Sequence, residues 1–452
     1  MMFGDTPDRN SQHGCPPSAQ HLITDVLVEI FLQCSLGDGL LPEPTLHSSP
    51  LNLGRVCHSW RQVALSTPQL WSSLRIPDTW NSPLGMTEWL KRSASLPLTV
   101  ILNDHDRLHG SSLYRIGALS ILLANAYRWK DVWVLADIEL VLLFLNAVEP
   151  GAPLLESLEI HDCEANDEFL AYTELDLPKY PRLKSLHLPG SVQVVLHHRN
   201  ITLRNLRIID FESQKVNCVG VMSMDDYLTL LTLSPNLDEA SFAITGSTPM
   251  KPMDDIIEHK IRQLCIFVPV GLNIGSFSHH LRLPHLSNLR IEDTTNKDPR
   301  EFPFNNIKSL LRRSQAPLTR LDIFWDIPPM VQSDGDVVDI LRLTPNIRSV
   351  SLHRLPVSDV LLRALAQPTT LGETASCLCP KLTEISVVRG GKFSESAVKD
   401  MILFREKHRG TKPFKRLRLL DCGLKWSILR MDEEVQNCIA RGLSVRIRRL
   451  NP

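Results

Sequence analysis

Apolar and polar residues alternate along most of this chain in one recurring pattern, Pro-x-Leu-x-x-Leu-x-Ile. Clear copies are PLLESLEI, PRLKSLHL, PHLSNLRI and APLTRLDI, and looser copies run from WKDVWVLAD to FKRLRLL. Alternation at every second residue is typical of a β-strand with one buried face. The pattern therefore predicts about ten short strands from residue 129 onward.

A central apolar residue marks the register of each predicted strand. Neighbouring markers are 20 to 35 residues apart, which is close to the period of leucine-rich repeats or somewhat longer. The markers are Val132, Leu158, Leu186, Leu206, Ala240, Leu264, Leu289, Leu321, Val350, Ile385 and Leu417. This spacing predicts that the strands lie side by side as an array of repeats.

Amphipathic segments precede many of these strands. Apolar residues recur at three- and four-residue intervals in residues 138–153, 225–237, 304–317, 336–347 and 394–410, which predicts helices. A strand-helix unit of this length cannot bury its apolar face alone, so stacked neighbours must complete the core. We therefore expect an α/β fold, a curved leucine-rich-repeat solenoid with a parallel inner sheet and outer helices.

The same alternation predicts which side chains leave the inner face of the sheet. Between the buried markers and their apolar neighbours lie polar and charged residues of both signs. Extended concave sheets of this kind commonly bind protein partners, although a merely solvated face gives the same pattern. The predicted substrate-binding residues are Trp133, Glu159, His187, Arg207, Arg290, Arg320, Asp322, Arg416 and Arg418.

The N-terminal region has a helical pattern instead. HLITDVLVEIFLQC (residues 21–34) has apolar residues at helical spacing, with Asp25 in the first turn. A loop containing glycine and proline follows, and a second helical pattern runs from Leu51 to Ala64 before the break at Thr67-Pro68. Four of the 8 tryptophans fall within residues 60–89, which predicts a dense apolar cluster or an interface here.

The combination of DVLVEIFLQC, RVCHSWRQVA and STPQLWSSL resembles the F-box, the adaptor-binding module of ubiquitin ligase substrate receptors, in the form abundant in mushroom-forming fungi. The resemblance covers about residues 20–77, and the divergent repeats downstream are similar to those that follow the F-box in that family. It implies a Skp-type adaptor as partner and, through the adaptor, a cullin and a RING-bearing ligase. The residues expected at the adaptor are Leu22, Leu27, Ile30, Phe31, Val56, Trp60 and Trp71.

The sequence departs from the family pattern where the first helix begins. The family has Leu-Pro at this point, and this chain has Leu22-Ile23, which removes a preset backbone angle and, by resemblance, an adaptor contact. Two functions stay open. In the first, the chain is a non-catalytic substrate receptor of a cullin-RING ligase. In the second, it is a leucine-rich-repeat scaffold whose residues 20–77 only cap the array.

Composition narrows the class of partner. The formal net charge is -1, so no global field attracts nucleic acid or an anionic membrane, and we expect neither as partner. The basic runs at residues 407–418 and 441–450 are expected to be solvated parts of the last repeats. Scattered cysteines and a polar, acidic N-terminus indicate reduced thiols in a cytoplasmic or nuclear protein.

Motifs for catalysis do not stand out. The chain contains no GxSxG, HExxH or P-loop, and Cys377-x-Cys379 lacks a second pair at zinc spacing. We therefore expect no enzymatic activity, no metal and no cofactor. The expected regions are a disordered tail (residues 1–19), an F-box-like helical module (20–77), a junction that forms a cap or first irregular repeat (78–128) and the solenoid (129–452).

Overall fold

The computed structural model describes residues 22–36, 41–77, 80, 82–103, 116–162, 174–189, 192–197, 201–212, 222–243, 256–268, 278–293, 302–325, 333–369, 376–408, 413–424 and 426–448. The predicted tail, residues 1–19, lies outside the described residues. The chain divides into two compact units, unit 1 (Met1–Glu164) and unit 2 (Ala165–Pro452). Both have a mixed α/β fold built on parallel strands.

No helix in the described ranges combines the length and the apolar character that crossing a membrane would require.

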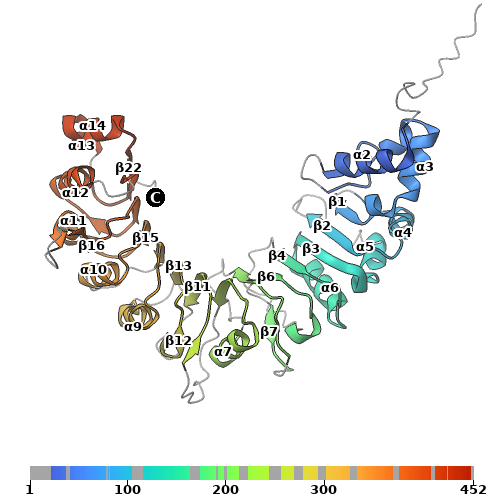
Figure 1. Ribbon diagram of the computed structural model, residues 1–452, viewed down its shortest axis with the longest axis horizontal. Helices are drawn as coiled ribbons and strands as arrows, with labels where there is room; N and C mark the ends of the chain where they lie inside the picture. The colour runs from blue at the N-terminus through green and yellow to red at the C-terminus, as the bar shows by residue number, and fades with distance from the viewer. Residues whose placement is uncertain are drawn as a thin grey trace, which may run out of the picture. The chain divides into compact units, whose positions relative to one another are not determined.

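Unit 1 begins with helices and continues with parallel strands (Figure 1). Its helical elements are α2 (Thr24–Leu36), η1 (Leu53–Arg55), α3 (His58–Ser66), η2 (Pro68–Trp71), α4 (Pro83–Arg92), α5 (Ile116–Leu123), η5 (Ala126–Arg128) and α6 (Ile138–Val148). Its strands pair in the order β1 (Ser73–Ile76), β2 (Leu98–Asn103), β3 (Trp129–Ala136) and β4 (Ser157–Asp162), all parallel.

The parallel strands begin earlier than the pattern predicts. β1 starts at Ser73, inside the segment expected to be all helical, and pairs with β2 in the segment expected to be a junction. The parallel strands therefore extend N-terminal to residue 129, into the segment for which a first irregular repeat was one of two expectations. With only Leu74 and Ile76 buried, β1 is too short for its alternation to stand out in the sequence. Residues 78–128, expected to form a junction, contain α4, β2 and α5.

The predicted second helix of unit 1 is two elements. η1 ends at Arg55 and α3 begins at His58, because Cys57 between them has an extended backbone with φ -158°. The apolar spacing of the sequence continues across this break and conceals it.

Ten parallel strands form the main sheet of unit 2. In order they are β6 (Ser185–Pro189), β8 (Ile208–Glu212), β9 (Glu239–Ala243), β11 (Gln263–Val268), β13 (Asn288–Asp293), β14 (Arg320–Phe324), β15 (Ser349–His353), β19 (Glu384–Val388), β21 (Arg416–Leu420) and β22 (Ser444–Arg448). Residues Leu264, Leu289, Leu321, Val350, Ile385 and Leu417 pair across neighbouring strands. The register predicted from the sequence markers is confirmed over these strands.

Helices and short strands connect the main strands. The helical elements are η6 (Leu177–Lys179), α7 (Met224–Leu233), α9 (Phe304–Ser314), α10 (Asp334–Leu343), α11 (Asp359–Leu365), α12 (Glu395–Lys407), α13 (Trp426–Met431) and α14 (Glu433–Ala440). The short strands are β5 (Glu174–Asp176), β7 (Gln193–Val195), β10 (Ile257–Glu258), β12 (Leu281–Arg282), β16 (Val357–Ser358), β17 (Pro368–Thr369), β18 (Ser376–Cys377) and β20 (Gly391–Lys392). The helices expected from the amphipathic segments are present as α6, α7, α9, α10 and α12.

The helices of unit 2 lie along one side of its strands (Figure 1). Apolar residues at alternate strand positions, such as Leu321 and Ile323, are buried beneath them. The other side of the sheet carries the remaining strand residues. We call this side the open face.

A repeated carboxylate contact joins successive helices. Asp334, the first residue of α10, accepts hydrogen bonds from the backbone N–H and the hydroxyl of Ser358, which caps α11. Asp359, the first residue of α11, accepts the same two bonds from Ser394, which caps α12. Each helix start is thereby held by the preceding helix as well as by its own cap.

One predicted strand is out of register. Leu206 was expected to be the central buried residue of a strand and Arg207 to point outward from it. Leu206 is buried, but it lies outside the strand, because β8 begins only at Ile208. Leu186 pairs with Ile209, and His187 pairs with Asp210. Arg207 lies in the turn before the strand, where its guanidinium donates to the carbonyl of Asn236. Asp210 therefore takes the outward position that was assigned to Arg207.

Candidate functional site

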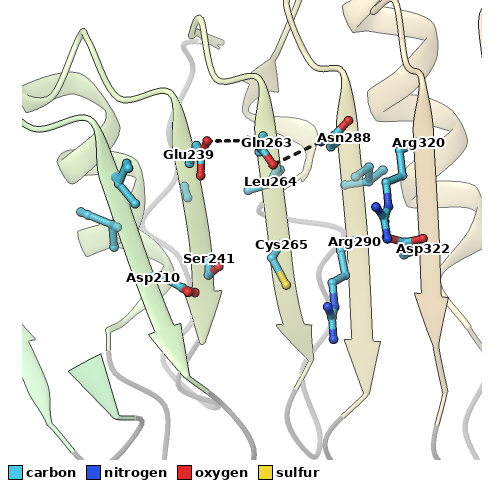
Figure 2. A pocket seen from close by; sticks show the side chains of 14 residues that line it. Asp210, Glu239, Ser241, Gln263, Leu264, Cys265, Asn288, Arg290, Arg320 and Asp322 are labelled. Carbon is cyan, nitrogen blue, oxygen red and sulfur yellow. Dashed lines mark hydrogen bonds and ion pairs between the residues drawn. The ribbon is translucent and has the colours of Figure 1, made fainter. Parts of the chain in front are cut away.

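The open face of unit 2 is hollowed over the five strands β8, β9, β11, β13 and β14. The hollow has a volume of about 270 Å³ and is lined by side chains from all five strands. Figure 2 shows the polar ones pointing away from the helices, with Asp210 and Ser241 near one end and Arg320 and Asp322 at the other. The strand alternation positions these side chains, because every second residue faces the same side.

A row of amides crosses the hollow near the starts of its strands. The Gln263 amide donates to the Glu239 carboxylate, and the Asn288 amide donates to the Gln263 oxygen at 3.2 Å (Figure 2). These contacts join β9, β11 and β13 through side chains at equivalent register positions. The side chains of this row carry both hydrogen-bond donors and hydrogen-bond acceptors, which a peptide lying across the strands could use.

Arginines and carboxylates occupy the next positions along the strands. Arg290 donates from Nε to Glu292 at 2.9 Å and lies over the Phe324 ring at 4.5 Å. Burial opposes its charge, but the Glu292 carboxylate outweighs burial, so the pKa of Arg290 is above its ordinary value. Arg320 donates to Asp322 at 2.7 Å, while the other oxygen of Asp322 has no hydrogen-bond partner among the described residues. Asp322 is only 6% exposed, so this orphaned oxygen is a costly feature.

Two titratable groups in this region are neutral at physiological pH. Burial raises the pKa of the Cys265 thiol to about 12, which keeps it protonated and unreactive. Burial, followed by the charge of Arg418, lowers the pKa of His353 to about 4. His353 stacks on Phe324 with ring centroids 4.1 Å apart. The hollow therefore presents charged side chains and a protonated thiol, and the Phe324 ring lies beside it under the Arg290 guanidinium.

The predicted substrate-binding residues lie in separate groups. Arg290, Arg320 and Asp322 line the hollow of unit 2. Trp133 and Glu159 lie in unit 1, where the indole N–H donates to the carboxylate at 3.0 Å.

Of the remaining four, three lie on the strands of unit 2, while Arg207 precedes β8. His187 pairs with Asp210 at 3.0 Å. Arg416 and Arg418 lie on β21, and Arg416 pairs with Glu384 at 3.0 Å.

Sequence reasoning missed three residues of this surface. Asp210 was not predicted to face outward, because the predicted strand is out of register with β8. Phe324 and His353 lie one alternation step beyond the predicted outward positions, at the ends of β14 and β15. Continuing the two-residue period past Asp322 and Ser351 would have found both.

The residues expected at the adaptor divide into buried and exposed sets. Leu27, Phe31 and Trp71 are at most 2% exposed, so they belong to the core of unit 1. Phe31 packs edge-on against the half-buried Trp60 with centroids 5.0 Å apart. The Trp71 indole donates to the carbonyl of Ala64 at 2.8 Å. Leu27, Phe31 and Trp71 therefore hold the helices of unit 1 together, and the expectation that they contact an adaptor stays a prediction.

The exposed set lies mainly on α2 and the residues before it. Leu22 and Ile30 are exposed as expected, and so is Val56 before α3. Ile23 and Val26 were not expected at an interface, but they are 66% and 40% exposed. We call Leu22, Ile23, Val26 and Ile30 the apolar stripe. Val26 and Ile30 lie one helical turn apart on α2, and Leu22 and Ile23 directly precede the helix.

Among the described residues, His, Cys, Asp and Glu form no group of three or more that could hold a metal ion.

Comparison of the chain with protein-family models gives no match, and comparison with curated proteins gives none either.

Proposed function

We propose that this chain is a non-catalytic substrate receptor of a cullin-RING ubiquitin ligase. Its N-terminal helices bind a Skp-type adaptor through the apolar stripe, and the open face binds a protein substrate. The observation that carries the proposal is the exposure of large apolar side chains along one side of α2. The F-box resemblance of the surrounding sequence supplies the class of partner.

The apolar stripe has the chemistry of a helix-in-groove interface. Its members are spaced by one, three and four residues, which is how amphipathic helices place anchors in a partner's groove. Leaving such side chains in water forgoes roughly 1.5–3 kcal/mol for each one that could be fully buried. A partner that covers the stripe recovers part of this free energy.

The buried aromatic residues pack α2, which carries part of the apolar stripe, against the neighbouring helices. Phe31 and Trp60 fix α2 against α3, and Trp71 ties η2 to the end of α3 through its bond to Ala64. Trp71 also packs against Trp89 of α4 at 4.9 Å. The tryptophans near the N-terminus therefore give a small helical module the rigidity that a preformed interface requires.

The repeat assignment rests on the strand register. Parallel strands pair in sequence order along unit 2, and helices lie between many of them, as expected for divergent leucine-rich repeats. In this function the chain supplies position rather than chemistry. Holding a substrate beside a ubiquitin-charged carrier raises its effective concentration there.

The proposal is tested by co-expressing the full chain with the Skp-type adaptor of its host. We expect a complex that survives size-exclusion chromatography at micromolar concentration. The double variant Val26→Asp/Ile30→Asp should lose the complex, because two carboxylates would enter an apolar groove. The matched control Leu84→Asp/Val360→Asp changes exposed apolar residues of α4 and α11 and should keep it.

A repeat scaffold without ligase recruitment is the second candidate. It is favoured by Leu22-Ile23, which stands where the family has Leu-Pro. Absence of a complex for the folded wild-type chain would refute the receptor function and leave the helices of unit 1 as a cap of the array.

A further inference from the structure

The last two strands of unit 2 carry four arginines on the open face. Arg416 and Arg418 lie on β21, and Arg446 and Arg448 lie on β22. Arg418 and Arg446 are direct partners in the strand register, and all four residues are exposed. We call these four residues the arginine ladder.

The ladder is poorly neutralised by the protein itself. Arg416 pairs with Glu384 of β19 at 3.0 Å. Within the described part of the chain, the other three arginines have no ion pair. Like charges opposite one another on neighbouring strands destabilise a sheet. An anionic partner would turn this unfavourable pairing into binding free energy.

The ladder is a local feature of the open face. The hollow over β8 to β14 is acidic on balance, because the carboxylates Asp210, Glu239 and Asp322 line it together with Arg290 and Arg320. The open-face residues Ser349 and Ser351 of β15, next to the hollow, are uncharged. The sign of the surface therefore changes between the middle of the sheet and its last strands, although the whole chain has a net charge of only -1.

We propose that the arginine ladder binds an extended, Asp/Glu-rich segment of the protein substrate. This inference rests on the proposed function, in which the open face binds the substrate, and it names the chemistry of the segment. Arginines two residues apart on one strand repeat every ~6.6 Å, and neighbouring strands lie ~4.8 Å apart. An extended peptide presents its own carboxylates at the same two-residue repeat, and guanidinium groups bind carboxylates in paired hydrogen bonds.

Protection of a sheet edge does not account for the ladder. Arginines on an edge strand discourage pairing with other chains, and β22 is the last of the ordered strands. Arg416 and Arg418 lie on β21, which is paired on both sides, with β19 and with β22. Protection of the edge strand β22 would not require charged side chains on β21. Between the arginines, the two strands β21 and β22 also carry no aromatic side chains that could stack on nucleic-acid bases.

The test is a fluorescence-anisotropy titration of fluorescein-labelled octaglutamate with the full chain. Wild type should bind, and the double variant Arg418→Ser/Arg446→Ser should bind at least about tenfold more weakly, as expected for two lost charge-assisted contacts. The control Arg282→Ser/Arg342→Ser removes the same charge from β12 and α10 and should change binding less than about twofold. The charge-reversed variant Arg418→Glu/Arg446→Glu should lose octaglutamate and gain octalysine.

Several results would overturn the inference. One is an absence of octaglutamate binding by wild type, and another is equal weakening in the ladder and control variants. Self-association of the ladder variant with unchanged peptide binding would assign the arginines to edge protection alone. Tighter binding of an octauridine RNA or a singly phosphorylated peptide would assign another ligand. Adaptor binding is measured separately, so a failure here with an intact adaptor complex rejects this inference and leaves the ligase function standing.

Discussion

At the scale of single residues, one buried carboxylate joins two successive helices of unit 2, α10 and α11. Asp334 is 3% exposed and accepts bonds from Ser358 and from the backbone N–H of Leu361. Its removal leaves several buried donors without an acceptor, which is more costly than the loss of a surface contact.

We therefore expect Asp334→Ala to lower the free energy of unfolding by about 1–3 kcal/mol. Urea denaturation followed by circular dichroism would show a lower midpoint. Asp400→Ala changes an exposed aspartate of α12 and should move the midpoint little. Equal midpoints for the two variants would contradict a structural role for Asp334.

His353 makes stability depend on pH. Its pKa is lowered from 6.5 in the unfolded chain to about 4 in the folded one, by burial and then by Arg418. Between these values the unfolded state binds a proton that the folded state does not, so stability falls as pH falls from 6.5 towards 4. Above pH 6.5 the residue is neutral in both states and contributes no pH dependence.

The variant His353→Gln should accordingly lose less stability than wild type between pH 7 and pH 5. Thermal unfolding at a series of pH values, with both proteins in the same buffers, measures the difference. Parallel curves for the two proteins would show that His353 titrates normally in the folded state.

At the scale of elements, α2 has two apolar sides with different tasks. Phe31 is fully buried against Trp60, while its neighbour Ile30 is 37% exposed. Phe31→Ala should destabilise unit 1 by about 3–5 kcal/mol, because it leaves a cavity in the core. Ile30→Ala should change stability by less than about 1 kcal/mol and should weaken adaptor binding instead.

Differential scanning calorimetry and adaptor pull-down on the two variants separate these effects. The assignment of the two sides of α2 would be reversed if Ile30→Ala lowered the melting temperature while Phe31→Ala left it unchanged.

At the scale of the whole molecule, the two proposed interfaces belong to different compact units. The apolar stripe lies in unit 1, and the arginine ladder lies in unit 2. Changes at sites that share no partners are usually additive. Val26→Asp/Ile30→Asp should therefore leave octaglutamate affinity unchanged, and Arg418→Ser/Arg446→Ser should leave adaptor affinity unchanged. Anisotropy titration and adaptor pull-down on both double variants measure this, and loss of both activities in either variant would indicate coupling or misfolding.

The sequence by itself determined the repeating strands and helices of unit 2. The sequence pattern alone aligns Leu264, Leu289 and Leu321, which pair across neighbouring strands in the structure. It can do so because two-residue alternation and the spacing of helices are local properties of the chain. The pattern failed where it was short or ambiguous. β1 has too few residues, and around β8 both Leu206 and Ile209 fit an alternating strand.

Only the tertiary structure decided which apolar residues are core and which are surface. Ile30 and Phe31 are equally apolar neighbours, and the packing of α3 against α2 is what buries one and leaves the other in water. The same holds for charge. Arg418 and Arg446 are 28 residues apart in the sequence and become direct neighbours only through strand pairing. Burial and proximity depend on contacts between distant segments, which local periodicity does not contain.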